Sequence, residues 1–302
     1  MIYYLKKTIE DHDIKTLENF ESDCWINVVN PTHKEIGLLV AEFNLDKNNL
    51  LSGIDPHEIP RVDFINEDIY TYIKTPYRNS KIGTFTLLIV MTKKFILTLS
   101  KEDVLSYENI SAGEMKNLSV EQKSKFFIAI LNMNNAIFKI KTLDIVKSIE
   151  TRNIKALKEK DIDEMISHEY ILNNFVSSYS YMNFMYNKII HRLGLLKQDK
   201  DILKELMIDA EEGGNICETS LKNISNIRNY NMILLTYRLN RLITTLTVVT
   251  VFLSVVAAIS SIYGMNIRLP LQDDGNAFLF VIFLITISWI IFIIYLRKKK
   301  VI

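Results

Sequence analysis

Uncharged polar side chains recur along one face of a long apolar stretch near the end of the chain. Five hydroxyl residues follow one another at steps of three, three, four and seven positions: Thr244, Thr247, Thr250, Ser254 and Ser261. A helix places residues at these spacings in one row. Such a row can line an aqueous path, or it can hydrogen-bond a neighbouring helix inside a membrane. The sequence leaves both interpretations open.

A second neutral row precedes the first at helical spacing. Its members are Asn215, Thr219, Asn223, Asn226 and Asn229, and Asn240 extends it toward the hydroxyl row. One interpretation is a solvated helix face. The other is an uncharged polar lining that lets a hydrated cation pass without being trapped, since conduction needs binding weak enough for the ion to leave.

Signatures of enzymatic chemistry are missing from the sequence. There is no Walker loop, dinucleotide fingerprint or nucleophile motif, and the five histidines have no metal-ligand spacing. The acidic stretches 158–164 and 209–212 can bind metal at subunit junctions, although a charged helix face is more often simply solvated. We therefore expect no enzyme, no cofactor and no tight structural metal site.

Overall charge and cysteine content limit the partners and the compartment. The formal net charge is only +1, which argues against a general nucleic-acid binder that neutralises phosphates. Cys24 and Cys217 belong to no C-x-x-C pair, so we expect free thiols in a reducing cytoplasm. The opening residues have no apolar core of a signal peptide, and the N-terminal part is therefore expected to be cytosolic.

The hydroxyl row lies in the first of two uncharged apolar runs, and the second run follows it. They cover residues 242–262 and 277–296, and about 20 residues at about 1.5 Å each cross roughly 30 Å of hydrocarbon. Arg238 and Arg241 precede the first run and the basic residues 297–300 follow the second, whereas the connecting loop contains only Arg268 as a basic residue. The positive-inside bias predicts two transmembrane helices with cytoplasmic N- and C-termini and an outward-facing loop.

The region before the membrane divides into an α/β part and a helical part. Residues 84–92 and 94–100 are rich in β-branched and aromatic residues and predict a hairpin. Thr32 and Glu35 have the spacing of a capping box, which predicts a helix. We expect an α/β domain over 1–112, a helical region and stalk over 113–241, and a membrane hairpin with a basic tail over 242–302.

Long helices are predicted where residues that break helices are missing. Between Gly113 and Gly194 there is neither proline nor glycine, and residues 195–201 are typical of a turn between antiparallel helices. From about Ile202 no proline occurs until Pro270, so one helix can continue into the membrane. We expect a break or bend at Gly213-Gly214, because each glycine costs about 1 kcal/mol relative to alanine.

The tetrapeptide YGMN, residues 263–266, directly follows the first apolar run and precedes the second run and the basic tail. In this position it resembles the signature of the CorA family of divalent-cation channels. Segments 24–36, 55–73 and 240–247 and the ending RKKKVI are similar to other parts of that family. The resemblance implies a funnel-shaped homopentamer in the cell membrane of a prokaryote, with the first span of each subunit lining one pore.

The family resemblance also assigns cargo and residues. It implies Mg²⁺ as the usual cargo, admission of Co²⁺ and Ni²⁺, and closure by intracellular metal. Gly264, Met265 and Asn266 match the outer mouth. Asn240 and Leu246 match positions that line the inner pore, and Ile243 stands where the family often has methionine, so Ile243 and Leu246 are candidates for an apolar gate. The helical spacing, and not the resemblance, adds Thr247, Thr250, Ser254 and Ser261 to the expected pore lining. Glu205, with Asp209 nearby, matches an acidic position that helps to bind the regulatory metal.

Asn266 is the residue whose chemistry best suits the cargo. Mg²⁺ releases its inner waters reluctantly, so neutral amide oxygens can hydrogen-bond those waters without removing them. Gly264 would permit backbone conformations needed at a helix end. The loop departs from the common family pattern in placing Arg268 before Asp273 and Asp274, and a positive charge near the mouth would repel Mg²⁺. Two alternatives remain: a ZntB-like zinc transporter and a non-conducting, membrane-anchored metal sensor.

Overall fold

A computed structural model of the chain describes residues 1–8, 14–77, 83–103, 119–151, 157–266 and 275–298. The chain forms two compact units, Met1–Ile227 and Arg228–Ile302. The helix α6 (Lys197–Tyr263) contributes residues to both units.

Among its described residues, the first unit contains a seven-stranded sheet with the order β2-β1-β3-β7-β6-β5-β4. The strands are β1 (Ile2–Lys6), β2 (Lys15–Leu17), β3 (Cys24–Val29), β4 (Arg61–Ile65), β5 (Asp68–Pro76), β6 (Thr84–Met91) and β7 (Phe95–Ser100). The β3–β7 pair is parallel and every other neighbouring pair is antiparallel. The predicted hairpin is confirmed as β6–β7, in which Met91 pairs with Ile96.

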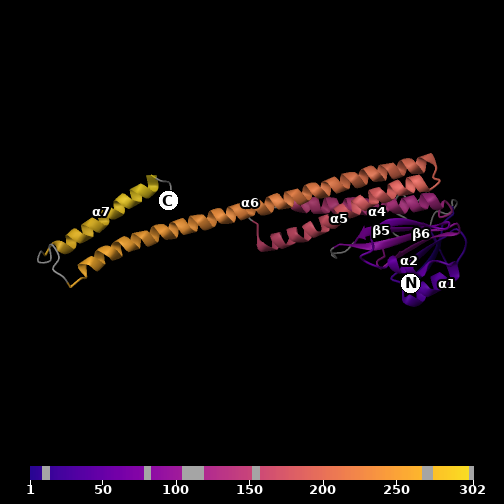
Figure 1. Cartoon of the computed structure of the whole chain (residues 1–302), viewed down its shortest axis with the longest axis horizontal. Helices are drawn as coiled ribbons and strands as arrows, with labels where there is room; N and C mark the ends of the chain where they lie inside the picture. The colour runs from indigo at the N-terminus through magenta and orange to yellow at the C-terminus, as the bar shows by residue number, and fades with distance from the viewer. Residues whose placement is uncertain (9–13, 78–82, 104–118, 152–156, 267–274, 299–302) are drawn as a thin grey trace. The chain divides into compact units, whose positions relative to one another are not determined.

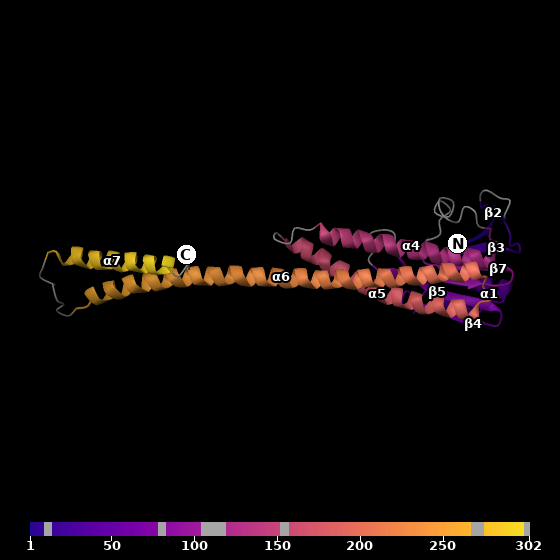
Figure 2. The same ribbon diagram turned by 90° about the horizontal axis from the view of Figure 1, so that it is seen from above.

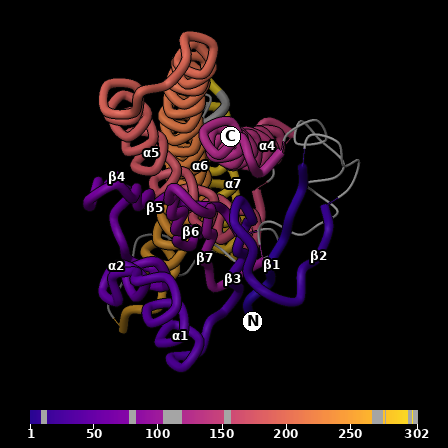
Figure 3. Tube along the Cα trace, turned by 90° about the vertical axis from the view of Figure 1, so that its right-hand side faces the viewer, coloured from indigo at the N-terminus to yellow at the C-terminus, as the bar shows by residue number. Residues whose placement is uncertain are grey.

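Helices cover both faces of this sheet (Figures 1 and 3). The short helices α1 (His33–Phe43) and α2 (Lys47–Ser52) pack on the face that includes Leu88, and the long helices pack on the face that includes Leu87. Since successive strand residues point to opposite faces and both faces are buried, the central strands are apolar almost throughout. The α/β prediction is confirmed as a three-layer arrangement.

The predicted capping box at the start of α1 is also confirmed. The Glu35 backbone N–H donates to Thr32 Oγ1 at 3.3 Å, and the Thr32 backbone N–H donates to Glu35 Oε2 at 2.7 Å. These bonds and the nearby terminal amine of Met1 lower the pKa of the Glu35 carboxyl group. The box fixes where the chain leaves β3 and enters the helical layer.

Three long helices lie side by side in the first unit (Figures 1 and 2). They are α4 (Lys123–Glu150), α5 (Glu159–Arg192) and the part of α6 up to Ile227. The predicted turn between α5 and α6 is confirmed but lies earlier, at residues 193–196, because α5 ends at Arg192 and α6 already begins at Lys197. Long helices and an extended α6 were therefore predicted correctly.

The expected break at Gly213-Gly214 is wrong, because α6 continues through both glycines. A Cβ atom at Gly213 would lie 2.4 Å from Cζ of Tyr179 on α5. The missing side chain thus lets an aromatic ring lie directly on the α6 backbone. Tertiary packing compensates for the low helix propensity of glycine at this point.

The second unit contains α6 from Arg228 onward and α7 (Ala277–Lys298). The rings of Phe252 and Trp289 pack edge to face, with centroids 3.5 Å apart. Within the described residues, α6 is long and apolar enough to cross a membrane, and α7 contains a shorter apolar stretch, Phe278–Ile294. The second membrane crossing and the pentamer remain predictions.

Candidate functional site

The hydroxyl row of α6 is fixed by hydrogen bonds to the helix backbone. Thr244 donates to the Asn240 carbonyl at 2.8 Å, and Thr247 donates to the Ile243 carbonyl at 2.8 Å. Thr250 and Ser254 make the same four-residue bond, at 2.9 and 2.8 Å. A hydroxyl has one proton to donate and two lone pairs, so a hydroxyl that donates to its own helix presents only acceptor capacity outward.

An outward row of acceptors suits a particular kind of ligand. The first-shell waters of a cation direct their oxygens toward the metal and their hydrogens outward, so they need acceptors from their surroundings. Oxygen atoms without charge supply such acceptors without replacing the waters. The sequence contained the signal for this bonding, since threonine and serine inside helices commonly bond the carbonyl four residues earlier.

The hydrogen bond to the carbonyl four residues earlier does not by itself distinguish the hydroxyl row from other residues of α6. Thr245, beside the row, donates to the Arg241 carbonyl at 2.9 Å in the same way. What distinguishes the row is that its members share one helix face. Thr245 lies off that face and therefore provides a matched comparison for the residues of the row.

The predicted outer mouth begins where α6 ends. The Gly264 N–H donates to the Ser260 carbonyl at 3.0 Å, and the Met265 N–H donates to the Ile262 carbonyl at 3.2 Å. Gly264 does not have a left-handed backbone, and a Cβ atom there would meet its nearest atom, the Ser260 oxygen, at 3.4 Å. The prediction that the helix end requires a backbone conformation special to glycine at position 264 is therefore wrong for the single subunit. Asn266 is exposed.

The loop that follows the mouth cannot be compared with the expectation. Arg268, Asp273 and Asp274 lie outside the described residues. The remaining candidates for the pore lining are also exposed on α6, and they are Asn240, Ile243, Leu246 and Ser261.

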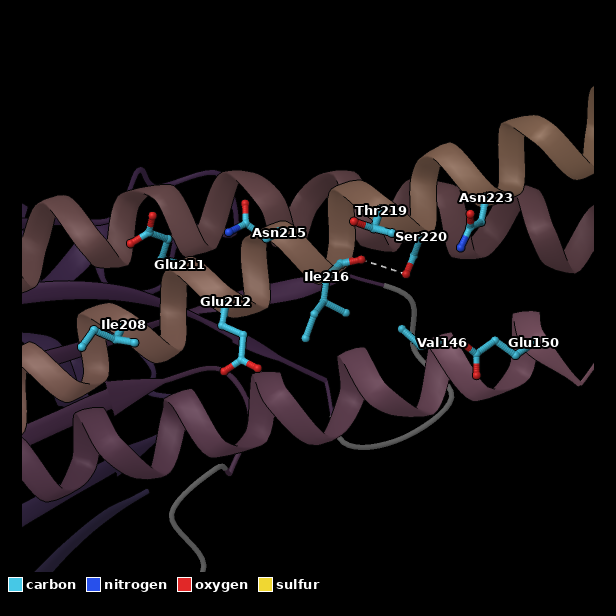
Figure 4. Close-up of a pocket in the computed structure, with 10 residues that line it drawn as sticks. All are labelled: Val146, Glu150, Ile208, Glu211, Glu212, Asn215, Ile216, Thr219, Ser220 and Asn223. Atoms are coloured by element: carbon cyan, nitrogen blue, oxygen red, sulfur yellow. Dashed lines mark hydrogen bonds between the residues drawn. The ribbon is translucent and has the colours of Figure 1, made fainter.

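The neutral row on the stalk part of α6 lies beside a groove (Figure 4). Asn215, Thr219 and Asn223 line this groove of about 540 Å³ together with Val146 and Glu150 from α4. Other members of its lining are Ile208, Glu211, Glu212, Ile216 and Ser220. The contribution of α4 was missed in the sequence, because nothing local indicates which residues lie next to a helix so far along the chain.

The two candidates for the regulatory metal have different surroundings. Glu205 is exposed, whereas Asp209 Oδ1 lies 3.4 Å from Lys139 Nζ on α4. Within the described ranges, no three His, Cys, Asp or Glu side chains are grouped so that they could hold a metal ion. Glu205 and Asp209 therefore need further ligands to form a site, and their role remains a prediction.

Taken together, the fold and the site define a class of protein. An α/β domain is joined by one unbroken helix to an apolar segment whose neutral polar face ends at a Gly-Met-Asn sequence. This arrangement fits a membrane protein, because a folded α/β domain continues into a helix that is long and apolar enough to cross a bilayer and that carries hydroxyl groups on one face.

Comparison with known proteins identifies the family within this class. Residues 21–298 match the family profile of the CorA-like Mg²⁺ transporter protein. The cobalt/magnesium transport protein CorA of Methanocaldococcus jannaschii is 23% identical over 288 residues, which cover 91% of this chain and 90% of the relative. The chain belongs to the CorA-like Mg²⁺ transporter family.

Solved structures agree with the fold. The complete structure of the CorA magnesium transporter from M. jannaschii has a TM-score of 0.88 at 20% identity and covers 100% of this chain and 99% of that chain. The cytoplasmic domain of ZntB from Vibrio parahaemolyticus has a TM-score of 0.61 at 8% identity and covers 76% of this chain and 95% of that chain. The fold alone therefore does not separate a CorA-like from a ZntB-like protein.

Proposed function

We propose that this protein is a channel-type transporter of divalent cations that chiefly takes up Mg²⁺ and also admits Co²⁺ and Ni²⁺. The observation that carries the proposal is the row of hydroxyl groups on α6 whose protons are bound within the helix. In a homopentamer, five such rows would surround one path with neutral acceptors. Hydrated cations would move along them without losing their inner waters.

Entry would occur at the Gly264-Met265-Asn266 sequence. Five Asn266 amides would form a neutral ring that bonds the outer hydrogens of a hydrated ion. A ring of carboxylates would hold the ion more tightly, and tight binding slows release. With a negative cell interior, the membrane potential favours cation entry by about 2.3 kcal/mol per charge for each 100 mV, so transport down the gradient requires no ATP.

Closure would depend on apolar rings and on intracellular metal. Ile243 and Leu246 would narrow the path where it enters the membrane, because apolar constrictions gate by losing water. Metal ions bound through Glu205 and Asp209, with ligands from a neighbouring subunit, would hold the closed form. Both termini would lie in the cytoplasm of a prokaryotic cell, and α7 would form the second membrane span.

The two alternatives predict different transport. A ZntB-like transporter would move Zn²⁺ in response to a proton gradient. A membrane-anchored sensor would assemble and bind metal but would not conduct.

Uptake into liposomes tests the proposal against both alternatives. The purified protein is reconstituted, and influx of Mg²⁺, Co²⁺ and Zn²⁺ is recorded with fluorescent indicators under a membrane potential or a proton gradient. We expect potential-driven Mg²⁺ and Co²⁺ influx that does not require a proton gradient. Zinc influx that requires the proton gradient would favour the ZntB-like alternative, and no influx from folded, assembled protein would favour the sensor.

A further inference from the structure

The helices α4, α5 and α6 are joined in their buried core by a layer of polar contacts. The hydroxyl oxygens of Thr142 on α4 and Tyr179 on α5 lie 3.2 Å apart, and Thr142 Oγ1 lies 3.8 Å from Cys217 Sγ on α6. Tyr179 also lies against Gly213, as described above. These contacts show that Thr142, Tyr179 and Cys217 lie at about the same position along the axes of the three helices.

A second set of residues repeats this arrangement seven positions away. Asn135 is seven residues before Thr142, and Tyr186 is seven residues after Tyr179. Because α4 and α5 are antiparallel and seven residues make about two helical turns, this step brings Asn135 to the level of Tyr186 on the same helix faces.

On α6, the residue at this second level is apolar. Ala210 is seven residues before Cys217 on α6 and is 0% exposed. Its methyl group leaves Asn135 and Tyr186 as the polar members of this second level.

The polar atoms at this second level are buried and unpaired. Asn135 is 3% exposed and Tyr186 is 0% exposed. Asn135 Oδ1 and the Tyr186 hydroxyl have no hydrogen-bond partner among the described residues. Burial raises the pKa of Tyr186, so its hydroxyl keeps a proton to donate. Leaving such groups unpaired would cost about 1–3 kcal/mol each.

We propose that an ordered water molecule bridges Asn135 Oδ1 and the Tyr186 hydroxyl, and that this hydrated layer and the Thr142–Tyr179 layer together fix the position of α6 along α4 and α5. The water accepts a hydrogen bond from tyrosine and donates one to the amide oxygen. Buried waters of this kind typically bond about three otherwise unsatisfied polar groups. Asn183 Oδ1, three residues before Tyr186, is also unpaired within the described part of the chain and is available as a further acceptor.

Two layers specify the register of the helices better than one. Sliding α6 by one helical turn would move Gly213 away from Tyr179 and would bring a side chain against the ring. The same shift would also move Ala210 away from Asn135 and Tyr186 and bring another residue of α6 to their level. The inference concerns the packing of these helices and does not depend on the proposed transport.

Replacing Tyr186 tests whether the bridging water is present, because the water predicts a fall in the apparent Tm and an unpaired hydroxyl does not. The full-length protein is studied in detergent with Trp289→Phe as background, so that buried Trp25 is the remaining tryptophan and its fluorescence reports the first unit. We expect Tyr186→Phe to lower the apparent Tm by about 2–4 °C, the shift for a loss of about 1 kcal/mol in a domain of this size. Removing a hydroxyl that has no partner would instead leave the Tm unchanged or raise it.

The partner variant and a matched control complete the test. Asn135→Leu should also lower the Tm, and the double variant should lose less than the sum of the two single losses, because both remove the same bridge. Tyr181→Phe on the same helix, where Tyr181 is 40% exposed, should leave the Tm within about 1 °C. A Tyr186→Phe protein that melts at or above the parent temperature, or strictly additive losses, would overturn the proposal.

Discussion

The adjacent glycines Gly213 and Gly214 have different surroundings although both lie inside α6. A Cβ at Gly213 would lie 2.4 Å from Tyr179 Cζ, whereas a Cβ at Gly214 would meet its nearest atom, Tyr179 Cβ, at 3.6 Å. The first distance requires the aromatic ring to move, and the second is an ordinary contact. Substitutions at these two positions therefore distinguish the effect of packing against Tyr179 from the effect of helix propensity.

We expect Gly213→Ala to destabilise the first unit by about 1–3 kcal/mol, the usual range for overpacking. Gly214→Ala should be neutral or should stabilise it by up to about 1 kcal/mol, because alanine favours the helix. Thermal unfolding followed by Trp25 fluorescence in the Trp289→Phe background measures both variants. Equal losses at the two positions would contradict the assigned role of the Tyr179 contact.

The two cysteines allow a test of burial at the residue scale. Cys24 and Cys217 are free and buried, and burial raises the pKa of the Cys217 thiol to about 11. Because the thiolate is the reactive form, its fraction at pH 8 should be very small. We expect little reaction of the folded protein with a thiol reagent at pH 8 and reaction of both cysteines after denaturation. Rapid modification of a folded sample would contradict the burial of these side chains.

At the scale of single elements, the proposed transport depends most on the hydroxyl row of α6. Thr247→Val and Thr250→Val remove an outward acceptor and keep the shape of the side chain. We expect each to reduce Mg²⁺ influx several-fold, because an unmet hydrogen bond to a water of the hydrated ion costs about 1 kcal/mol. Influx into liposomes at equal protein content measures the effect.

Thr245→Val is the matched control for this comparison. Thr245 has the same bond to its own helix but lies off the row. Its replacement should leave influx close to that of the parent protein. An equal loss for Thr245→Val and Thr250→Val would show that the hydroxyls act through helix stability and would contradict the lining role.

Elements with strong local signals were predicted from the sequence. The β6–β7 hairpin follows from two apolar runs around a short turn, and the α1 start follows from the Thr32–Glu35 spacing. Helices α4 and α5 follow from a long stretch without proline or glycine. These signals are contained within a few neighbouring residues or turns.

Features that depend on distant residues were not predicted. The parallel pairing of β3 with β7 joins segments separated by many residues, and no local pattern specifies it. The same holds for Gly213, since the continuity of α6 depends on Tyr179 in another helix. For the site, the rows on α6 could be recognised from spacing, but the groove wall formed by α4 could not.

At the scale of the whole molecule, the proposed path requires several copies of the chain. The apolar part of α6 exposes residues such as Ile243 and Leu246 alongside its hydroxyl row. Subunits packed around an axis would cover part of that surface and enclose the polar face. We expect native mass spectrometry of the detergent-solubilised protein to give a pentamer. A stable monomer or dimer that still transports Mg²⁺ would contradict the central path.

The central claim is that a neutral ring of Asn266 side chains admits hydrated Mg²⁺. Mg²⁺ influx into liposomes under a fixed membrane potential, compared between the parent protein and Asn266→Ala, tests it most directly. Loss of the five amides should reduce influx by at least about tenfold, the effect of about 1.4 kcal/mol on the barrier, while assembly and thermal stability stay unchanged. Equal influx from both proteins, or none from an assembled parent protein, would contradict the claim.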